Sequence, residues 1–447
     1  MSRPIHKIGW ILAAGLSLGL GFILIWLSIS GEKPPPSRGD AASLLNTLDE
    51  NLILKTANLS QYEHLIHLFD KKWEAFCRHP ERKSVDGFFL SALDPFPLRP
   101  IRRYPGARYP EDAAYEADEF RGYRMAVSSN RKTLYVSLDK DFSKYQKVRP
   151  GEEIPPLRHY YLDRIEDGQL KLLWGNLKPN YNLCESFLEM FRITGRKKYL
   201  RPAKDILLYL IDRLDEHGRY RLPFPGSPLK YRAIYQSYLL RILQDYIRLS
   251  PSREPALEEG LQRIGRAFRF TDEGVWDHFL EAVIGLAIVE KLGIQTVSWD
   301  WTLKKIQALY VHILGHDGRI PFSLRPRDPP QTIWNYHNYN TMLLAELSAK
   351  YLQKDIGLEK IFPLIFQAAK KNGDRRLFRG LYYAKLQFRF DDPEWARQKE
   401  VEIWKSDSFI EIPFLLKYQI LSDVRKPPIP AEARPAGKAK KPARGIR

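Results

Sequence analysis

The sequence has few of the residues that bind metals or cross-link a chain. Only two cysteines, Cys77 and Cys184, occur among its 447 residues. They form either one disulfide or two buried thiols, and the sequence leaves both alternatives open. No Cys/His spacing is typical of a zinc site, and no Asp-rich loop is typical of a calcium site. The sequence therefore indicates no metal and no other cofactor.

Acidic residues are scarce relative to basic ones. The chain has 71 Lys and Arg against 53 Asp and Glu, a formal net charge of +18. Part of the excess lies in the tail 425–447, a Pro- and Ala-rich segment that lacks the residues of a core. We expect this tail to be a disordered, solvated extension. The remaining positive charge favours an acidic partner, and nucleic acid, anionic lipid and polyuronate all qualify.

One long hydrophobic run lies near the N-terminus. Residues 8–29 carry no charged side chain, and at ~1.5 Å rise per residue a helix of this length spans a bilayer. Basic residues within 1–7 precede it, and a polar, Pro-rich linker at 30–40 follows it. The positive-inside rule therefore predicts a cytoplasmic N-terminus, a single-pass signal anchor and a periplasmic or extracellular location for the rest. A cleaved signal peptide is the alternative. This topology argues against nucleic acid as a partner.

The rest of the chain divides into three regions that differ in composition and in hydrophobic pattern. Apolar residues at helical spacings predict a helix over 41–76, within an arm at 41–80. Residues 81–173 are rich in Pro, Gly and Tyr, and their short alternating runs predict a small β-rich or irregular region. Residues 174–424 show long amphipathic helices joined by Gly- and Pro-containing loops. The fold class is thus expected to be mostly α.

The helices of 174–424 are predicted to form successive hairpins. First helices begin roughly every 45 to 60 residues, which is too long a repeat for a tetratricopeptide array. In a closed ring of such hairpins, the inner helices start at one rim, around a central cavity. The expected pairs are 182–193 with 199–214, 231–249 with 255–268, 277–292 with 299–314, 335–352 with 358–371, and 377–390 with 393–405.

Aromatic and polar residues open each first helix. Aromatic rings stack on sugar faces, amides and guanidinium groups bind hydroxyls and carboxylates, and Tyr and His also transfer protons. The alternative is a purely structural role, in which the polar residues cap the helix start and the aromatic residues belong to the core. The predicted catalytic residues are Tyr336, His337 and His278, and the predicted substrate-binding residues are Asn182, Arg232, Tyr235, Gln236, Asp277, Trp334, Asn335 and Tyr339.

Three segments, at 224–249, 275–292 and 317–347, resemble successive parts of the C-terminal domain of D-glucuronyl C5-epimerases. The resemblance extends over about residues 176–350. It implies an incomplete (α/α) toroid after β-rich segments, and action on glucuronate within a heparan- or heparosan-type polymer. Trp334-x-Tyr336-His337 falls where the family has Trp-Asp-Tyr-His, which implies that Tyr336 is a catalytic tyrosine.

The sequence departs from the family at two positions. Where the family has a second catalytic tyrosine, this chain has Pro321 and Phe322, and neither side chain carries a proton. The family's Gln-Gly-Gln is only partly present, as Gln236-Ser237-Tyr238. The second proton carrier is then His337, Tyr339 or His278, unless the chemistry differs or is absent.

The chemistry of uronates leaves more than one activity open. Removal of the proton at C5 needs a base, and a cation or hydrogen-bond donor must hold the carboxylate as charge builds on it. We predict a C5-epimerase-like isomerase, with a β-eliminating lyase or a non-catalytic subunit of an export or biosynthesis complex as alternatives. A glycoside hydrolase needs two carboxyl groups at ~5–9.5 Å, and we rank it lower. Its possible acids are Glu185, Asp277, Glu281 and Asp317.

Overall fold

The computed structural model describes residues 50–79, 82–102, 106–139, 141–224, 227–230, 232–271, 274–324, 332–353, 356–371 and 376–424. Within these residues the chain is mostly helical with a small β region, which confirms the predicted class. None of the described helices is both long and apolar enough to cross a membrane. The predicted signal anchor, its flanking segments and the basic tail lie outside the described residues.

The arm is broken, so the prediction of one helix over 41–76 is wrong in its described part. Helix α3 spans Glu50–Thr56, a 3-10 turn spans Leu59–Tyr62, and α4 spans Glu63–Arg78. The break occurs at Asn58, whose extended backbone lets its side-chain oxygen accept a hydrogen bond from the Ser60 N–H. Cys77 at the end of α4 is exposed, and Cys184 is buried in the helical region; both are free thiols.

The β region consists of two five-stranded antiparallel sheets that share a core. In the first, β9 and β10 form a hairpin, and β10 also pairs with β2 and β3; in the second, β4 to β8 follow chain order. The strands are β1 Lys83–Val85, β2 Phe88–Ala92, β3 Phe96–Pro97, β4 Arg99–Pro100, β5 Ala113–Phe120, β6 Tyr123–Ser128, β7 Leu134–Ser137, β8 Tyr145–Val148, β9 Tyr160–Glu166 and β10 Gln169–Trp174.

The ten predicted helices of the third region all occur, within a few residues of their expected bounds. They are α5 Leu177–Thr194, α6 Leu200–Asp212, α7 Ala233–Leu249, α8 Pro255–Ala267, α9 Trp276–Lys291, α10 Trp299–Gly315, α11 Trp334–Glu346, α12 Leu358–Lys370, α13 Leu377–Phe388 and α14 Pro393–Lys405. Three features were not predicted: α15 at Ile412–Val424, the hairpin of β11 (Leu222–Phe224) and β12 (Ser227–Lys230), and a π-helical turn at Leu347–Leu352 that extends α11.

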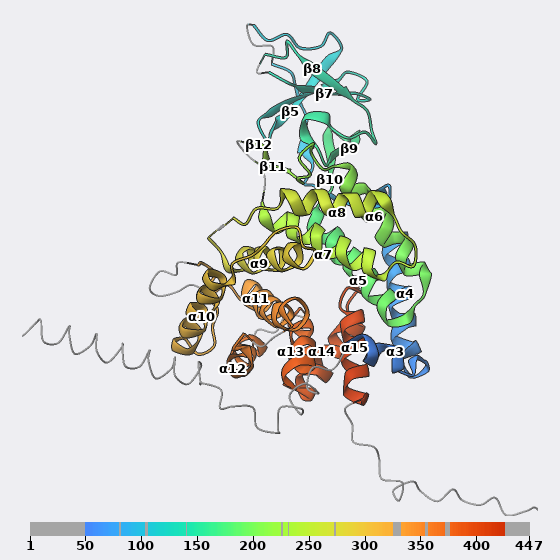
Figure 1. Ribbon diagram of the computed structural model, residues 1–447. Coiled ribbons are helices and arrows are strands. Elements are labelled where there is room, and N and C mark those ends of the chain that lie inside the picture. The colour runs from blue at the N-terminus through green and yellow to red at the C-terminus, as the bar shows by residue number, and fades with distance from the viewer. Residues whose placement is uncertain are drawn as a thin grey trace, which may run out of the picture.

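Alternate helices pack on one another in order. α5 contacts α7, and the succession continues through α9, α11, α13 and α15, which returns to α5 (Figure 1). These inner helices are buried on nearly all sides, as in α9, whereas α8 and α12 bury one apolar stripe. The sequence therefore sorts helices into an inner circuit and an outer set by how much of each surface is apolar.

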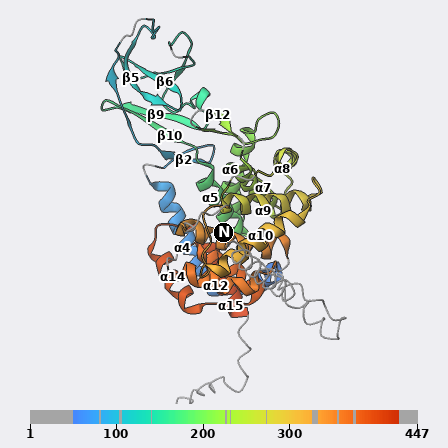
Figure 2. The ribbon, with the colours of Figure 1, turned by 90° about the vertical axis from the view of Figure 1, so that its left-hand side faces the viewer.

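The β region joins the helices where the inner helices begin. Strand β10 ends at Trp174, and Asn176 then caps α5 by accepting from the Lys178 N–H. The ring of Phe88 in β2 stacks on Tyr209 of α6, with ring centres 4.1 Å apart. The sheets consequently project from one end of the helical body in both views (Figure 1, Figure 2).

Candidate functional site

The first turns of the inner helices meet at one rim. The Lys178 ammonium of α5 lies 4.5 Å from the centre of the Tyr339 ring of α11, and the Arg376 guanidinium, just before α13, lies 5.9 Å from it. Tyr238 of α7 shares a hydrogen bond with Tyr339, at 3.3 Å between the two hydroxyl oxygens. Because these contacts join early turns of different helices, the helices run parallel and start on the same side. We call the groups Lys178, Asp277, His278, Tyr336 and Arg376 the rim site.

A layer of tyrosines lies below the rim site. The Tyr181 ring stacks on Tyr238 with centres 4.6 Å apart, and the Tyr339 hydroxyl donates to Glu281. Burial raises the pKa of all three phenols well above the usual value, so they remain protonated. Tyr339, a predicted site residue, is therefore a neutral hydrogen-bond donor. The Glu281 carboxylate already accepts its hydrogen bond.

Ion pairs fill the middle of the circuit beneath the tyrosines. Arg241 binds both oxygens of Glu281 through Nη1, at 2.9 and 2.8 Å, and Glu346 through Nη2 at 2.7 Å. Arg379 bridges Glu346 and Glu185 from the other side, at 2.6 and 2.7 Å. These five residues, here called the ionic core, occupy the space where a central cavity was expected. Such charges are stable in a buried position only when they are paired.

The pKa values of Glu346 and Glu281 in the ionic core shift in opposite directions. Burial opposes ionisation of Glu346, but Arg241, Arg379 and Lys350 together lower its pKa to about 2. Burial dominates at Glu281, whose pKa is raised despite Arg241. A further layer of ion pairs closes the opposite end of the circuit. It contains Glu50, Glu189, Arg192, Asp245, Lys350 and Lys417.

Asp277 differs from the acids of the ionic core because its pairing is incomplete. Its side chain is buried, and no hydrogen bond reaches its Oδ1 within the described residues. Its nearest ionisable partner is His278, at 3.7 Å from Nε2 to Oδ2. Burial raises the pKa of Asp277, and the positive charges of His278 and Lys178 only partly offset this.

Lys178 is the complementary group. Burial lowers its pKa, the carboxylates of Glu281 and Asp277 oppose the shift, and the Arg376 cation adds to it. An acid whose pKa is raised and a base whose pKa is lowered thus stand at one place. Opposite pKa shifts of this kind occur at catalytic sites and also in structural ion-pair networks.

Tyr336 is the exposed member of the rim site. Its side chain is 37% exposed, and its ring lies edge-on to Phe322 with centres 4.8 Å apart. The Phe322 carbonyl accepts a hydrogen bond from the Trp276 N–H at the start of α9, and Ser323 forms a bridge with Val275. The chain segment around Phe322 therefore fixes the start of α11 beside the start of α9, which carries Asp277.

The side chains of two predicted site residues, His337 and Gln236, form hydrogen bonds with backbone groups. The Nδ1 of His337 accepts from the Ile320 N–H at 3.0 Å, and its Nε2 lies 3.3 Å from the Ile365 carbonyl, to which it donates as a neutral imidazole. Burial lowers the pKa of His337 to about 4. The Gln236 amide similarly bridges the N–H and carbonyl of Tyr220, at 3.2 and 2.7 Å. Both side chains are buried and join loops to inner helices.

The remaining predicted residues spread along the rim. Asn335 is exposed, and Trp334 is half-buried with its ring against His337. Asn182 is half-buried on α5. Arg232 and Tyr235 are half-buried at the start of α7. Tyr235 is close enough to Tyr160 of the β region to contribute to the raised pKa of Tyr160.

The carboxyl groups considered for a hydrolase are not arranged as a free pair. Glu185 and Glu281 both bind Arg241, at 3.5 and 2.8 Å. Asp317 lies in the turn after α10 with a φ of 51°. Two of the four acids are therefore held by a shared cation, and a third lies in a turn.

The sequence did not single out Lys178, Arg376 or three members of the ionic core, and it gave the other two, Glu185 and Glu281, only as possible acids of a hydrolase. One signal was available: Glu185, Glu281 and Glu346 each have mostly apolar immediate neighbours in the sequence, and a charged residue in such a place marks a buried ion pair as well as an exposed face. Within the described residues, no group of three or more His, Cys, Asp or Glu side chains is placed to hold a metal ion. No protein-family model, curated protein or solved structure matches the chain.

Proposed function

We propose that this protein binds an acidic, uronate-containing polysaccharide at the rim site and exchanges the proton at C5 of glucuronate, as a C5-epimerase does. The observation that carries the proposal is that two half-buried cations, Lys178 and Arg376, lie over the Tyr339 ring, and that Lys178 is close enough to the incompletely paired acid Asp277 for each to shift the pKa of the other. Cations hold a substrate carboxylate most strongly when charge builds on it, and an acid with a raised pKa serves as a base close to neutral pH.

Each step has a candidate group. Asp277 removes the C5 proton, and the resulting charge moves onto the substrate carboxylate, which Lys178 and Arg376 stabilise. A second group then returns a proton from the other face of the sugar. The exposed hydroxyl of Tyr336 is suited to this step, and the resemblance to the epimerase family also implies a catalytic role for it. His278, beside Asp277, orients that carboxyl group or exchanges its proton with solvent.

The architecture is consistent with this proposal. The closed succession of α5, α7, α9, α11, α13 and α15, with outer helices between them in the chain, supports an (α/α) toroid preceded by a β region. We further propose that residues 8–29 anchor the protein in a membrane and that the toroid faces the periplasm or the exterior, where acidic polysaccharides occur.

A non-catalytic role in binding or assembly of the polymer is the second candidate. It is favoured because the possible carriers of the second proton are absent or already engaged. Phe322 stands where the epimerase family has its second tyrosine. His337 forms hydrogen bonds with two backbone groups, and Tyr339 donates to Glu281. A lyase needs the same base and cations, but it protonates the leaving oxygen at C4 instead of returning a proton to C5.

Incubation of the full-length protein in detergent with heparosan, alginate or polygalacturonate in deuterated water separates these activities. Deuterium at C5 without chain cleavage, detected by NMR, is the expected result. Ultraviolet absorbance from unsaturated uronate would instead establish a lyase. Polymer binding without either signal would contradict catalysis and support the binding role.

A further inference from the structure

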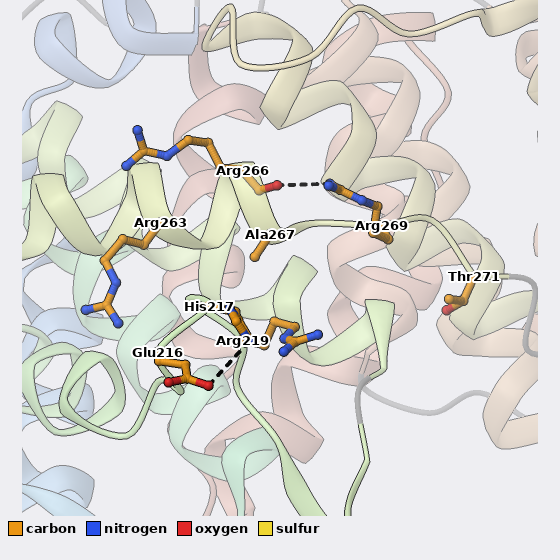
Figure 3. A pocket seen from close by; sticks show the side chains of 8 residues that line it. All are labelled: Glu216, His217, Arg219, Arg263, Arg266, Ala267, Arg269 and Thr271. Atoms are coloured by element: carbon orange, nitrogen blue, oxygen red, sulfur yellow. Dashed lines mark hydrogen bonds and ion pairs between the residues drawn. The ribbon is translucent and has the colours of Figure 1, made fainter.

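A basic pocket lies at the outer edge of the same rim. Its volume is about 600 Å³, within the range of ligand sites, and it lies between the loop after α6 and the end of α8 (Figure 3). Both of these segments lead into an inner helix that starts at the rim. The lining residues on which the argument depends are His217, Arg219, Arg263 and Arg266, and we call them the arginine pocket.

Positive charge in the arginine pocket is only partly compensated. Asp215 Oδ2 accepts a hydrogen bond from Arg219 Nε at 3.1 Å and forms an ion pair with Arg221 Nε at 2.8 Å, so one carboxylate compensates two guanidinium groups. Arg263 donates to the neutral backbone carbonyl of Asp215 at 3.0 Å, and the Arg266 side chain is exposed. Guanidinium groups held in this way keep donors and charge for an outside anion.

The arrangement of the arginines favours a ligand with several anionic groups. Arg263 and Arg266 are three residues apart on α8 and therefore neighbour each other on one helix face. Figure 3 shows Arg219 on the separate segment across from them. Anionic groups along one chain can engage guanidinium groups on both segments at once.

The arginine pocket is also connected to the rim site. The chain that leaves α8 lines the pocket at Arg269 and Thr271, and it then leads to Asp277 in the first turn of α9. A polymer that crosses the starts of the inner helices and continues outward over α8 would contact the rim site first and the arginine pocket next.

We propose that the arginine pocket is an accessory subsite that binds carboxylates of the same acidic polysaccharide, several sugars away from the rim site. This rests on the proposed function for the identity of the polymer. The subsite contributes affinity for long chains without taking part in the reaction, because multiple weak contacts along one chain act together.

The test compares the R263Q/R266Q double variant with wild type and with R397Q, in full-length protein. Arg397 is a matched control, because it is exposed on another outer helix and also donates to a backbone carbonyl, that of Pro393. Calorimetry measures binding of heparosan oligosaccharides of two lengths, a tetrasaccharide and a much longer chain. The double variant is expected to bind the long chain about tenfold more weakly, with unchanged tetrasaccharide affinity and an unchanged circular dichroism spectrum.

Other outcomes separate this proposal from the proposed function. Unchanged long-chain affinity in R263Q/R266Q, or an equal loss in R397Q, contradicts the subsite alone. Saturation of the pocket by inorganic phosphate, with no advantage for the long chain, would make it a small-anion site and also overturn the subsite. A wild-type protein that binds neither oligosaccharide contradicts both proposals. Binding without turnover contradicts the epimerase activity. The difference in long-chain affinity between the double variant and wild type then still tests the subsite.

Discussion

The ionic core and the rim site contain the same kinds of side chain in different states of pairing. In the ionic core, Arg241 alone makes two hydrogen bonds to Glu281 and one to Glu346, and Arg379 completes the set. At the rim, by contrast, a buried oxygen of Asp277 lacks a hydrogen bond within the described residues. The carboxylates of the ionic core are all held by guanidinium groups, whereas a buried carboxylate oxygen without a hydrogen bond costs stability and is a candidate for binding a ligand or taking part in a reaction. Under the proposed function, the middle of the circuit contributes stability and its edge carries the reaction.

Asp277→Asn should give the largest effect on activity. Because Asn cannot accept the C5 proton, we expect deuterium incorporation to fall by about 10²–10⁴-fold. Stability at neutral pH should be unchanged or slightly higher, since the raised pKa of Asp277 means that its ionised form is penalised by folding. Rates of exchange and urea unfolding curves of the same samples check both parts. A variant that loses activity only because it unfolds would contradict the assignment.

Arg241→Met should give the largest effect on stability. It leaves Glu281 and part of Glu346 without their main cation in a buried position, at an expected loss of about 3–5 kcal/mol in the free energy of unfolding. Denaturant unfolding measures this loss. Arg397→Met, on an exposed outer helix, is the control and should differ from wild type by less than about 1 kcal/mol. Equal effects of the two substitutions would contradict a structural role for the ionic core.

Acid should weaken the helical body through the ionic core. The pKa of Glu346 is lowered from 4.5 to about 2. A depressed carboxyl pKa stabilises the folded state fully above the unfolded value, and this contribution is lost as pH falls from 4.5 toward 2. Unfolding free energies measured over this range should therefore decline with falling pH in wild type, and less steeply in Glu346→Gln. The exposed Glu402→Gln should keep the wild-type slope.

His337→Leu should have a smaller effect that distinguishes a structural histidine from a catalytic one. Removal of the imidazole leaves the Ile320 N–H without its acceptor, and we expect a loss of about 1–3 kcal/mol in stability. Deuterium exchange per folded molecule should fall by less than tenfold. A loss comparable with that of Asp277→Asn would show that His337 takes part in the reaction.

The sequence predicted the helices well because their apolar stripes repeat at the helical period. It missed α15, whose residues 412–424 are apolar on nearly all sides and give no stripe to detect. It also gave Glu185 and Glu281 only as possible acids of a hydrolase, because nothing in the sequence shows that they share a cation. Their shared partner Arg241 lies on another helix, so only the folded packing brings the three together.

The sequence predicted where the rim site lies more accurately than which residues form it. Tyr336 and His337 are adjacent in the chain, yet one is 37% exposed and the other is 1% exposed. Successive residues in an α-helix point in different directions, so a dense polar cluster at a helix start divides between solvent and core. Lys178 and Arg376 were missed because their closeness to Tyr339 depends on parallel helices that are distant in sequence.

The most direct test of the account compares Tyr336→Phe with Tyr145→Phe. Both tyrosines are 37% exposed and lie edge-on to one aromatic ring, but Tyr145 belongs to the β region, away from the rim. In deuterated water with heparosan, Tyr336→Phe should incorporate deuterium at C5 at least about 100-fold more slowly than wild type. Tyr145→Phe should match wild type. Equal rates in the two variants would contradict a reaction at the rim site.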